Sequence, residues 1–114
     1  MKVLQVQVRS KVWLEAKGRP VLGPGRVELL KYIDEQGSIS SASRLMKITY
    51  RKAWGQIKAM ELQLGLPLVR KQTGGAEGGG ARLTPEAHEL LGDYLQLAQG
   101  IGEEVDRRFR EIFL

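Results

Sequence analysis

The sequence predicts a mainly α-helical domain with a small β-component, and three observations support this prediction. Residues 40–65 show helical periodicity on both sides of a short turn. Residues 68–84 are strand-like and are interrupted by a run of glycines, and residues 85–114 carry a long apolar stripe at helical spacing. With 114 residues, of which 42% are apolar, the chain is long enough for one domain with a modest core.

The composition excludes several classes of protein. Cysteine is absent, which excludes disulfides, thiolate metal sites and cysteine catalysis. No apolar run reaches the ~18 residues that a membrane-spanning helix needs. The first residues alternate apolar and polar side chains and do not resemble a signal peptide. We therefore expect a cytoplasmic protein.

The net charge of +5 is unevenly distributed along the chain. Residues 44–82 contain eight basic and two acidic residues, whereas residues 83–114 contain three basic and seven acidic residues. Basic residues clustered on one segment indicate a polyanionic partner. Charge alone fits an ordinary solvated surface equally well, so the positions of the cations have to decide between the two.

The N-terminal part of the chain, residues 1–23, is predicted to form a β-hairpin. Apolar residues alternate with polar ones from Leu4 to Val8, which is typical of a half-buried strand, and the alternation can continue through Val12 and Leu14 after a bend near Ser10. Residues 17–20 have turn chemistry, and residues 20–22 are suited to a short returning strand. We expect this hairpin to cover one side of a helical domain.

Three helices are predicted next. The first is an amphipathic helix over residues 24–36, which starts at Pro24 and stops at Gly37. Residues 40–65 then predict a helix–turn–helix, with Ser40 as the N-cap of the shorter helix and Thr49 as the N-cap of the longer one. The inward stripe of the longer helix is Ala53, Ile57, Met60 and Leu64.

The outward face of the longer helix is basic and contains a small residue. If the apolar stripe points inward, then Arg51, Gly55 and Lys58 point outward, with Tyr50 and Trp54 on a flank. Such a helix, held by a shorter one, suits the major groove of double-stranded DNA. Tyr50 is equally suited to a base contact and to packing, whereas Trp54 is better suited to the core. The residues expected to contact DNA here are Ser40, Thr49, Tyr50, Arg51, Lys52 and Lys58.

Residues 68–84 predict a second hairpin, which makes the fold a winged helix-turn-helix. The tip contains five glycines, and basic residues flank it. A nucleotide-binding glycine loop is disfavoured, because neither the GxxxxGK[ST] pattern nor a strand–helix context is present. A disordered loop is the simpler alternative. We expect phosphate contacts from Arg70, Lys71 and Arg82 and from the tip glycines Gly74, Gly75, Gly78, Gly79 and Gly80.

The final helix, residues 85–114, starts with Thr84 as the cap and Pro85 in the first turn. At ~1.5 Å per residue it reaches roughly 43 Å, which is longer than a small domain needs. Its near-heptad stripe predicts a dimerisation helix, and the alternative is that the helix folds across its own core. The expected interface residues are Leu91, Tyr94, Ala98, Ile101, Val105, Phe109 and Ile112.

No catalytic or metal-binding group is predicted. His88 is the single histidine, and no carboxylate cluster suited to a metal lies near it in the sequence. Adjacent acidic residues on a helix point in different directions and are typical of a solvated face. No nucleophile–base pair is visible, so we expect neither an enzyme nor a cofactor.

The motifs resemble those of a known family. GSIS at residues 37–40, TYRKAW at 49–54, the glycine-rich tip and ARLTPEA at 81–87 are similar to the N-terminal winged-helix domain of the ModE-type molybdate-dependent transcriptional regulators. VWLEAKGRPVLGPGR at residues 12–26 also resembles the strand and turn before the first helix in that family. More distantly, residues 38–69 are similar to the DNA-binding domain of LysR-type regulators.

The resemblance implies a homodimer that binds a palindromic operator and regulates transcription. Thr49, Tyr50, Arg51 and Trp54 match the motif of the family's recognition helix, and the tip glycines match its wing. ModE-type proteins continue into molybdate-binding domains, whereas this sequence ends at Leu114. We therefore expect a stand-alone DNA-binding domain whose effector, molybdate or tungstate among the candidates, is sensed by a separate protein. The alternative is an interaction module that recruits a partner through the long helix.

Overall fold

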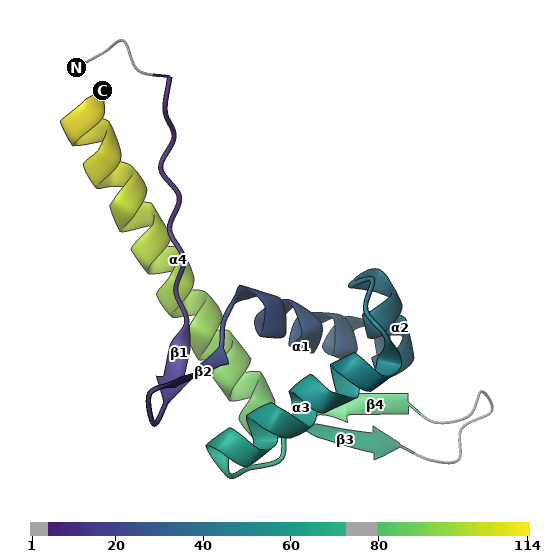
Figure 1. Ribbon diagram of the computed structural model, residues 1–114. Coiled ribbons are helices and arrows are strands. Elements are labelled where there is room, and N and C mark those ends of the chain that lie inside the picture. Colours follow the sequence, from purple (N-terminus) through teal and green to yellow (C-terminus); the bar gives the residue numbers. More distant parts are fainter. Residues whose placement is uncertain (1–4, 73–79) are drawn as a thin grey trace.

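A computed structural model describes residues 5–72 and 80–114 of the chain. In these ranges it contains four helices and two separate antiparallel hairpins, each of two strands (Figure 1). The predicted class, mainly α-helical with a small β-component, is confirmed. The elements in chain order are β1 (Leu14–Ala16), β2 (Arg19–Leu22), α1 (Pro24–Gln36), α2 (Ile39–Leu45), α3 (Tyr50–Leu64), β3 (Val69–Gln72), β4 (Gly80–Leu83) and α4 (Pro85–Phe113).

In the N-terminal hairpin the first strand is confined to the end of the predicted stretch, whereas the returning strand lies where the sequence predicts it. Strands β1 and β2 are joined by the two-residue loop Lys17-Gly18, in which both residues have positive φ (54° and 78°). A two-residue loop of this kind matches the twist of a hairpin. The predicted strand near Val6 and Val8 is wrong, because no described strand lies beside this segment. Instead the segment extends along α4 (Figure 1).

Helix α1 forms as predicted and packs against α2. It begins with Pro24 and ends at Gly37, whose φ of 66° places it in the left-handed region that glycine adopts without strain. Its apolar stripe is fully buried against α2, β2, β4 and the first turns of α4. The buried residues of the stripe are Val27, Leu29, Leu30 and Ile33.

The predicted cap of α2 is wrong by two residues. The N-cap is Ser38, whose side-chain oxygen accepts a hydrogen bond of 3.1 Å from the backbone N–H of Ser41. Ser40 lies inside the helix, where its carbonyl oxygen accepts from the hydroxyl of Ser43. The earlier start buries Ile39 in the core, which a helix starting at Ser41 would not include. The correction moves the short helix but leaves the helix-turn-helix in place.

Helix α3 forms as predicted. The hydroxyl of Thr49 caps it by accepting from the N–H of Lys52 at 3.0 Å, and Gly65 ends it with a φ of 72°. Ala53, Ile57 and Met60 are completely buried. Local capping and one apolar stripe therefore account for the position of this helix.

The second hairpin also forms where the sequence predicts it. Strand β3 pairs with β4 in a register that sets Val69 opposite Leu83 and Arg70 opposite Arg82. Val69 and Leu83 are buried, so one face of the hairpin lies on the core. The tip glycines Gly74, Gly75, Gly78 and Gly79 lie outside the described residues, whereas Gly80 begins β4.

Helix α4 starts in the core and then projects away from it as an arm (Figure 1). Thr84 caps it through the N–H of Ala87. Leu91 and Tyr94, which the sequence assigned to a dimer interface, are 7% and 5% exposed within the single chain. This assignment is therefore wrong for these two residues, because the first three turns of the helix supply the domain's own core. Ala98 packs at the margin of that core.

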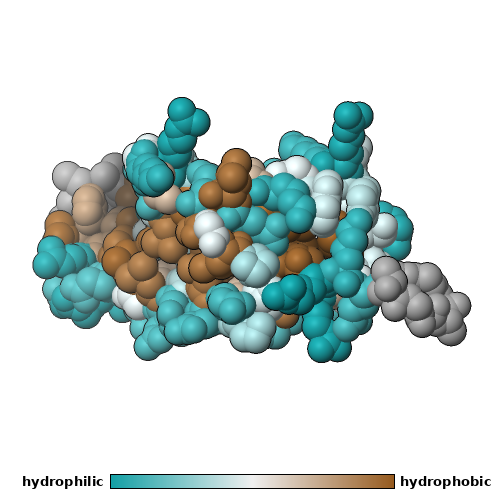
Figure 2. All heavy atoms as spheres, turned by 90° about the horizontal axis from the view of Figure 1, so that it is seen from below, coloured by the Kyte–Doolittle hydropathy of each residue, from teal (hydrophilic) through white to brown (hydrophobic). Residues whose placement is uncertain are grey.

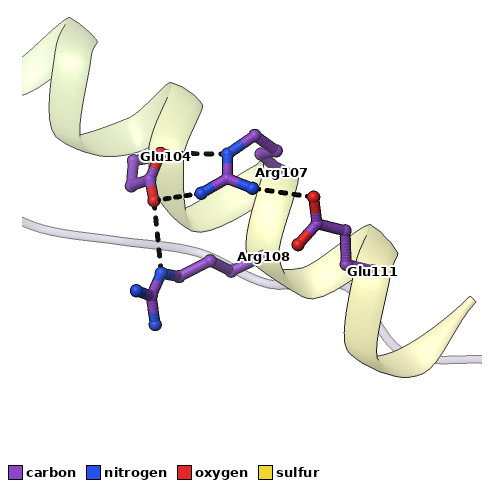
Figure 3. Close-up of polar contacts among 4 residues, drawn as sticks. All are labelled: Glu104, Arg107, Arg108 and Glu111. Carbon is purple, nitrogen blue, oxygen red and sulfur yellow. Dashed lines mark hydrogen bonds and ion pairs between the residues drawn. The ribbon is translucent and has the colours of Figure 1, made fainter.

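The projecting part of α4 carries charged residues on one side and apolar residues on another. Arg107 pairs with Glu104 and Glu111, and Arg108 also pairs with Glu104 (Figure 3). Hydrogen bonds from Arg107 and Arg108 lower the pKa of Glu104. Pairs at these spacings support a helix that has little packing of its own. On the apolar side, Ile101 and Ile112 are 43% and 68% exposed.

No helix of the described residues is long and apolar enough to span a membrane.

Candidate nucleic-acid interface

The first two turns of α3 present basic side chains to solvent. Arg51 and Lys52 follow the cap residue Thr49 and are exposed. Within the described ranges, neither forms an ion pair. Two free cations at a helix N-terminus are unfavourably placed relative to the helix dipole, and a bound anion would offset that cost. This end of α3 is therefore suited to a polyanion.

Gly55 lies on the same exposed face as Arg51. A Cβ atom at Gly55 would meet nothing within 4 Å, so no packing inside the domain requires glycine there. Glycine inside a helix costs about 1 kcal/mol relative to alanine. The open surface leaves room for close approach by a second molecule.

Arg51 and Lys52, adjacent in the sequence, face different sides of α3. Lys52 borders a hollow of about 730 Å³ between α3 and the N-terminal hairpin, which Gly55 and Trp13 also line. Arg26 closes part of this hollow and donates hydrogen bonds to the carbonyl oxygen of Val21 and to the side chain of Gln63. The hairpin is therefore joined to the side of α3 that faces away from β3 and β4.

The three cations of the second hairpin do not share one face. Arg70 and Arg82 lie directly opposite each other on the exposed face, and like charges in this position destabilise a strand pair. Lys71 lies one residue further, on the face that contains Val69 and Leu83. The sequence treated these cations as one group, whereas the structure divides them into an outer pair and an inner lysine.

The inner lysine reaches the aromatic flank of α3. The Nζ atom of Lys71 is 4.3 Å from the ring centroid of Trp54 and 5.5 Å from that of Tyr50. The Nζ atom of Lys58 is also 4.3 Å from the ring of Trp54. Trp54 is half-buried against the core, so its predicted place at the edge of the apolar stripe is confirmed. Both lysines are held by cation–π attraction at the junction of α3 and the hairpin.

Glu61, which the sequence did not single out, connects the same two elements. Its Oε2 atom accepts hydrogen bonds from the backbone N–H groups of Leu68 (2.7 Å) and Val69 (3.2 Å), and its Oε1 atom accepts from Lys58 (3.1 Å). Partial burial tends to raise the pKa of Glu61, but the hydrogen bonds outweigh it and lower the pKa below its ordinary value. No spacing in the sequence indicates the contacts with Leu68 and Val69.

The remaining predicted contacts gather beside this junction. Ser40, Tyr50 and Lys71 line a smaller hollow of about 190 Å³ between α2, α3 and the hairpin. Tyr50 is 40% exposed and is therefore available to a partner. Seen from below the view of Figure 1, hydrophilic residues surround the base of the hairpin tip, whereas apolar residues gather over the middle of the molecule (Figure 2). In the described part of the chain, no three histidine or acidic side chains come together to hold a metal.

The chain matches the family model of the bacterial regulatory helix-turn-helix proteins of the LysR family over residues 25–88. It is 39% identical over 82 residues to the molybdenum-pterin-binding protein MopB of Rhodobacter capsulatus, covering 72% of this chain and 30% of that protein. It is 42% identical over 94 residues to the DNA-binding transcriptional dual regulator ModE of Escherichia coli K12, covering 82% of this chain and 36% of that protein.

The solved structures that resemble this chain include DNA-binding domains. The CbnR DNA-binding domain in complex with DNA superposes with a TM-score of 0.58 and 21% identity, covering 75% of this chain and 93% of that one. The BenM DNA-binding domain in complex with benA site 1 DNA superposes with a TM-score of 0.55 and 21% identity, covering 75% and 90%. At this identity the likeness shows the fold alone. The chain spans about a third of the length of the curated relatives it matches.

Proposed function

Because the chain belongs to the bacterial regulatory helix-turn-helix family of the LysR type, we propose that it is a sequence-specific DNA-binding transcriptional regulator of the ModE-like kind. One observation carries this proposal. The exposed face of α3, with Arg51 and Gly55, lies next to a hairpin whose outer face sets Arg70 opposite Arg82. None of Arg51, Arg70 and Arg82 forms an ion pair within the described residues. A duplex would neutralise all three, since phosphates lie on each side of its grooves.

In this proposal α3 enters the major groove and the hairpin follows the neighbouring backbone. Arg51 and Tyr50 read base edges near the start of α3, where a recognition helix makes its base contacts. Thr49 and Lys52 at the helix start, Arg70 and Arg82 on the hairpin, and the tip glycines bind phosphates. Ser40 lies inside α2 and lines the same small hollow as Tyr50, so its hydroxyl would approach the DNA strand that Tyr50 contacts.

The projecting arm of α4 supports the further proposal of a homodimer on a palindromic operator. Ile101 and Ile112 remain exposed, and they share the stripe with the half-buried Val105 and Phe109. An exposed apolar stripe on a long helix is stabilised by pairing with a second copy. The interface proposed here therefore begins at Ala98, beyond Leu91 and Tyr94.

The names of the relatives suggest the effector of the proposed regulator. ModE of Escherichia coli and MopB of Rhodobacter capsulatus, two of the relatives, carry names of transcription regulation and molybdenum-pterin binding. This chain aligns with about a third of each. We propose that this chain supplies the DNA-binding part of a response to molybdate or tungstate.

The proposal is tested by selecting bound duplexes from a random library and measuring affinity by fluorescence anisotropy at several salt concentrations. Arg51→Ala should weaken binding to the selected duplex by roughly tenfold or more, because a bidentate base contact contributes about 1–3 kcal/mol. Lys31→Ala, which removes an exposed cation from α1, is the matched control and should have little effect. If the wild-type chain selects no sequence and fails to bind random duplex even at low salt, the proposal is wrong. The exposed α4 stripe would then favour a protein-interaction module.

A further inference from the structure

We propose that Lys58 of α3 and Lys71 of β3 form one binding site for a single DNA phosphate, organised by the ring of Trp54, which both side chains contact. This inference rests on the proposed DNA-binding function and specifies one contact within it. It separates these two lysines from Arg70 and Arg82, which lie on the outer face of the hairpin.

The geometry brings the two ammonium groups to the same aromatic ring. Each Nζ atom lies 4.3 Å from the ring of Trp54, although the lysines come from different elements. The lysine at position 58 extends from the exposed side of α3, and the lysine at position 71 extends from the inner face of the hairpin. A phosphate at the junction of the two elements is therefore within reach of both flexible side chains.

The electrostatics of this group favour an anion. Two ammonium groups on one ring repel each other, and the face of an indole offsets only part of that repulsion. Glu61 pairs with Lys58 at 3.1 Å, whereas Lys71 has no acidic partner among the described residues. The cluster therefore keeps a net positive charge, which one phosphodiester group would neutralise.

The cluster is assembled before any ligand arrives. The carboxylate of Glu61 pairs with Lys58, and it also accepts hydrogen bonds from the backbone N–H groups of Leu68 and Val69, at the start of β3. The same carboxylate thus fixes the strand that carries Lys71 relative to α3. Pre-organised groups lose less conformational entropy on binding. A phosphate held here would set the register between the recognition helix and the hairpin.

The test is a double-mutant cycle in the full chain, with Lys58→Gln, Lys71→Gln and the double variant bound to the selected duplex. If both lysines hold one phosphate, each single variant weakens binding by roughly tenfold, and the double variant weakens it little more than either single one. The slope of log affinity against log salt is negative, and its magnitude should fall by about 0.9 in the double variant, as expected for one phosphate. The matched pair Lys58→Gln with Arg82→Gln should be additive, because these side chains bind different phosphates.

A second readout follows Trp54 itself. In a Trp13→Phe background Trp54 is the single tryptophan, so its fluorescence reports on this site. Binding of the duplex should change that fluorescence, and the change should be lost in the double lysine variant at saturating DNA. Circular dichroism melts check that each variant is folded.

Two results would overturn the inference. Additive losses of affinity with a fall in salt slope of about 1.8 would assign the lysines to two separate phosphates. A fluorescence change that persists in the folded double variant would remove Trp54 from the phosphate site. In both cases the wild-type chain still binds DNA, so the proposed function stands. A wild-type chain that binds no duplex would remove both proposals.

Discussion

The hydroxyl of Tyr94 on α4 donates a hydrogen bond of 2.6 Å to the backbone carbonyl oxygen of Val12 in the N-terminal segment. The two residues are 82 positions apart, and the bond attaches the segment before β1 to the base of the arm. Burial also raises the pKa of Tyr94. A residue expected at a subunit interface thus connects two distant segments of one chain.

Removing this hydroxyl should destabilise the domain. Tyr94→Phe should lower the free energy of unfolding by about 1 kcal/mol, because it deletes one hydrogen bond and keeps the buried ring. Urea unfolding followed by circular dichroism measures the change. Tyr50→Phe removes an exposed hydroxyl and should leave stability unchanged. Equal stability of Tyr94→Phe and wild type would show that the bond to Val12 contributes nothing.

The carboxylate of Glu61 should make stability depend on pH. The pKa of Glu61 is lower in the folded chain than in the unfolded chain. The ionised carboxylate therefore contributes its full stabilisation at pH values above the unfolded pKa, and this stabilisation is lost as the pH falls through the folded pKa. Below about pH 5, the free energy of unfolding should therefore decrease less steeply with falling pH in Glu61→Gln than in the wild type. Urea unfolding across this range measures it, with Glu35→Gln on the exposed side of α1 as the control. An unchanged pH profile in Glu61→Gln would contradict the assignment.

The two threonine caps should differ in their importance. Thr84 is 1% exposed, and its hydroxyl both accepts from Ala87 and donates to the carbonyl oxygen of Pro67. Thr49 is exposed and accepts from Lys52. Thr49→Ala should cost about 1 kcal/mol of stability, and Thr84→Ala should cost more, because it also leaves buried groups unpaired. Thermal melts rank the two variants, and the reverse order would refute this account.

Replacing Gly55 with alanine should increase stability and reduce affinity for DNA. Gly55→Ala should stabilise α3 by roughly 0.5–1 kcal/mol, since a Cβ atom there meets nothing within 4 Å. If this face lies against DNA, the same methyl group should weaken binding to the selected duplex. Gly92→Ala on α4, where the added Cβ also meets nothing within 4 Å, should stabilise the chain without affecting affinity. Unchanged affinity in Gly55→Ala would place the DNA elsewhere.

The arm of α4 should determine the oligomeric state. Ile101→Glu with Ile112→Glu places charges on the exposed stripe and should shift the chain from dimer to monomer, as measured by sedimentation velocity over a range of concentrations. Leu62→Glu replaces an apolar residue of α3 that is 86% exposed and is the control for the added charge. A wild-type chain that sediments as a monomer at all concentrations would exclude the dimer.

Features set by neighbouring residues could be read from the sequence. Thr49 and Gly65 bracket α3, and Thr84 with Pro85 starts α4, because capping involves atoms within four residues of each other. The cap of α2 was misplaced because Ser38 and Ser40 are equally good caps in sequence. The burial of Ile39 decided between them, and that depends on the assembled core.

Patterns of neighbouring residues were enough to predict the helices, the glycine-tipped hairpin and the basic segment that joins them. The grouping of the cations depends on tertiary contacts. The ammonium group of Lys71 lies over the ring of Trp54, whereas Arg70 lies opposite Arg82. In the sequence all three residues simply flank the glycine-rich tip. The tertiary structure also assigned Leu91 and Tyr94 to the domain core rather than to a second chain. An apolar stripe records that a helix face is buried, whereas the partner that buries it is set by contacts between residues far apart in the chain.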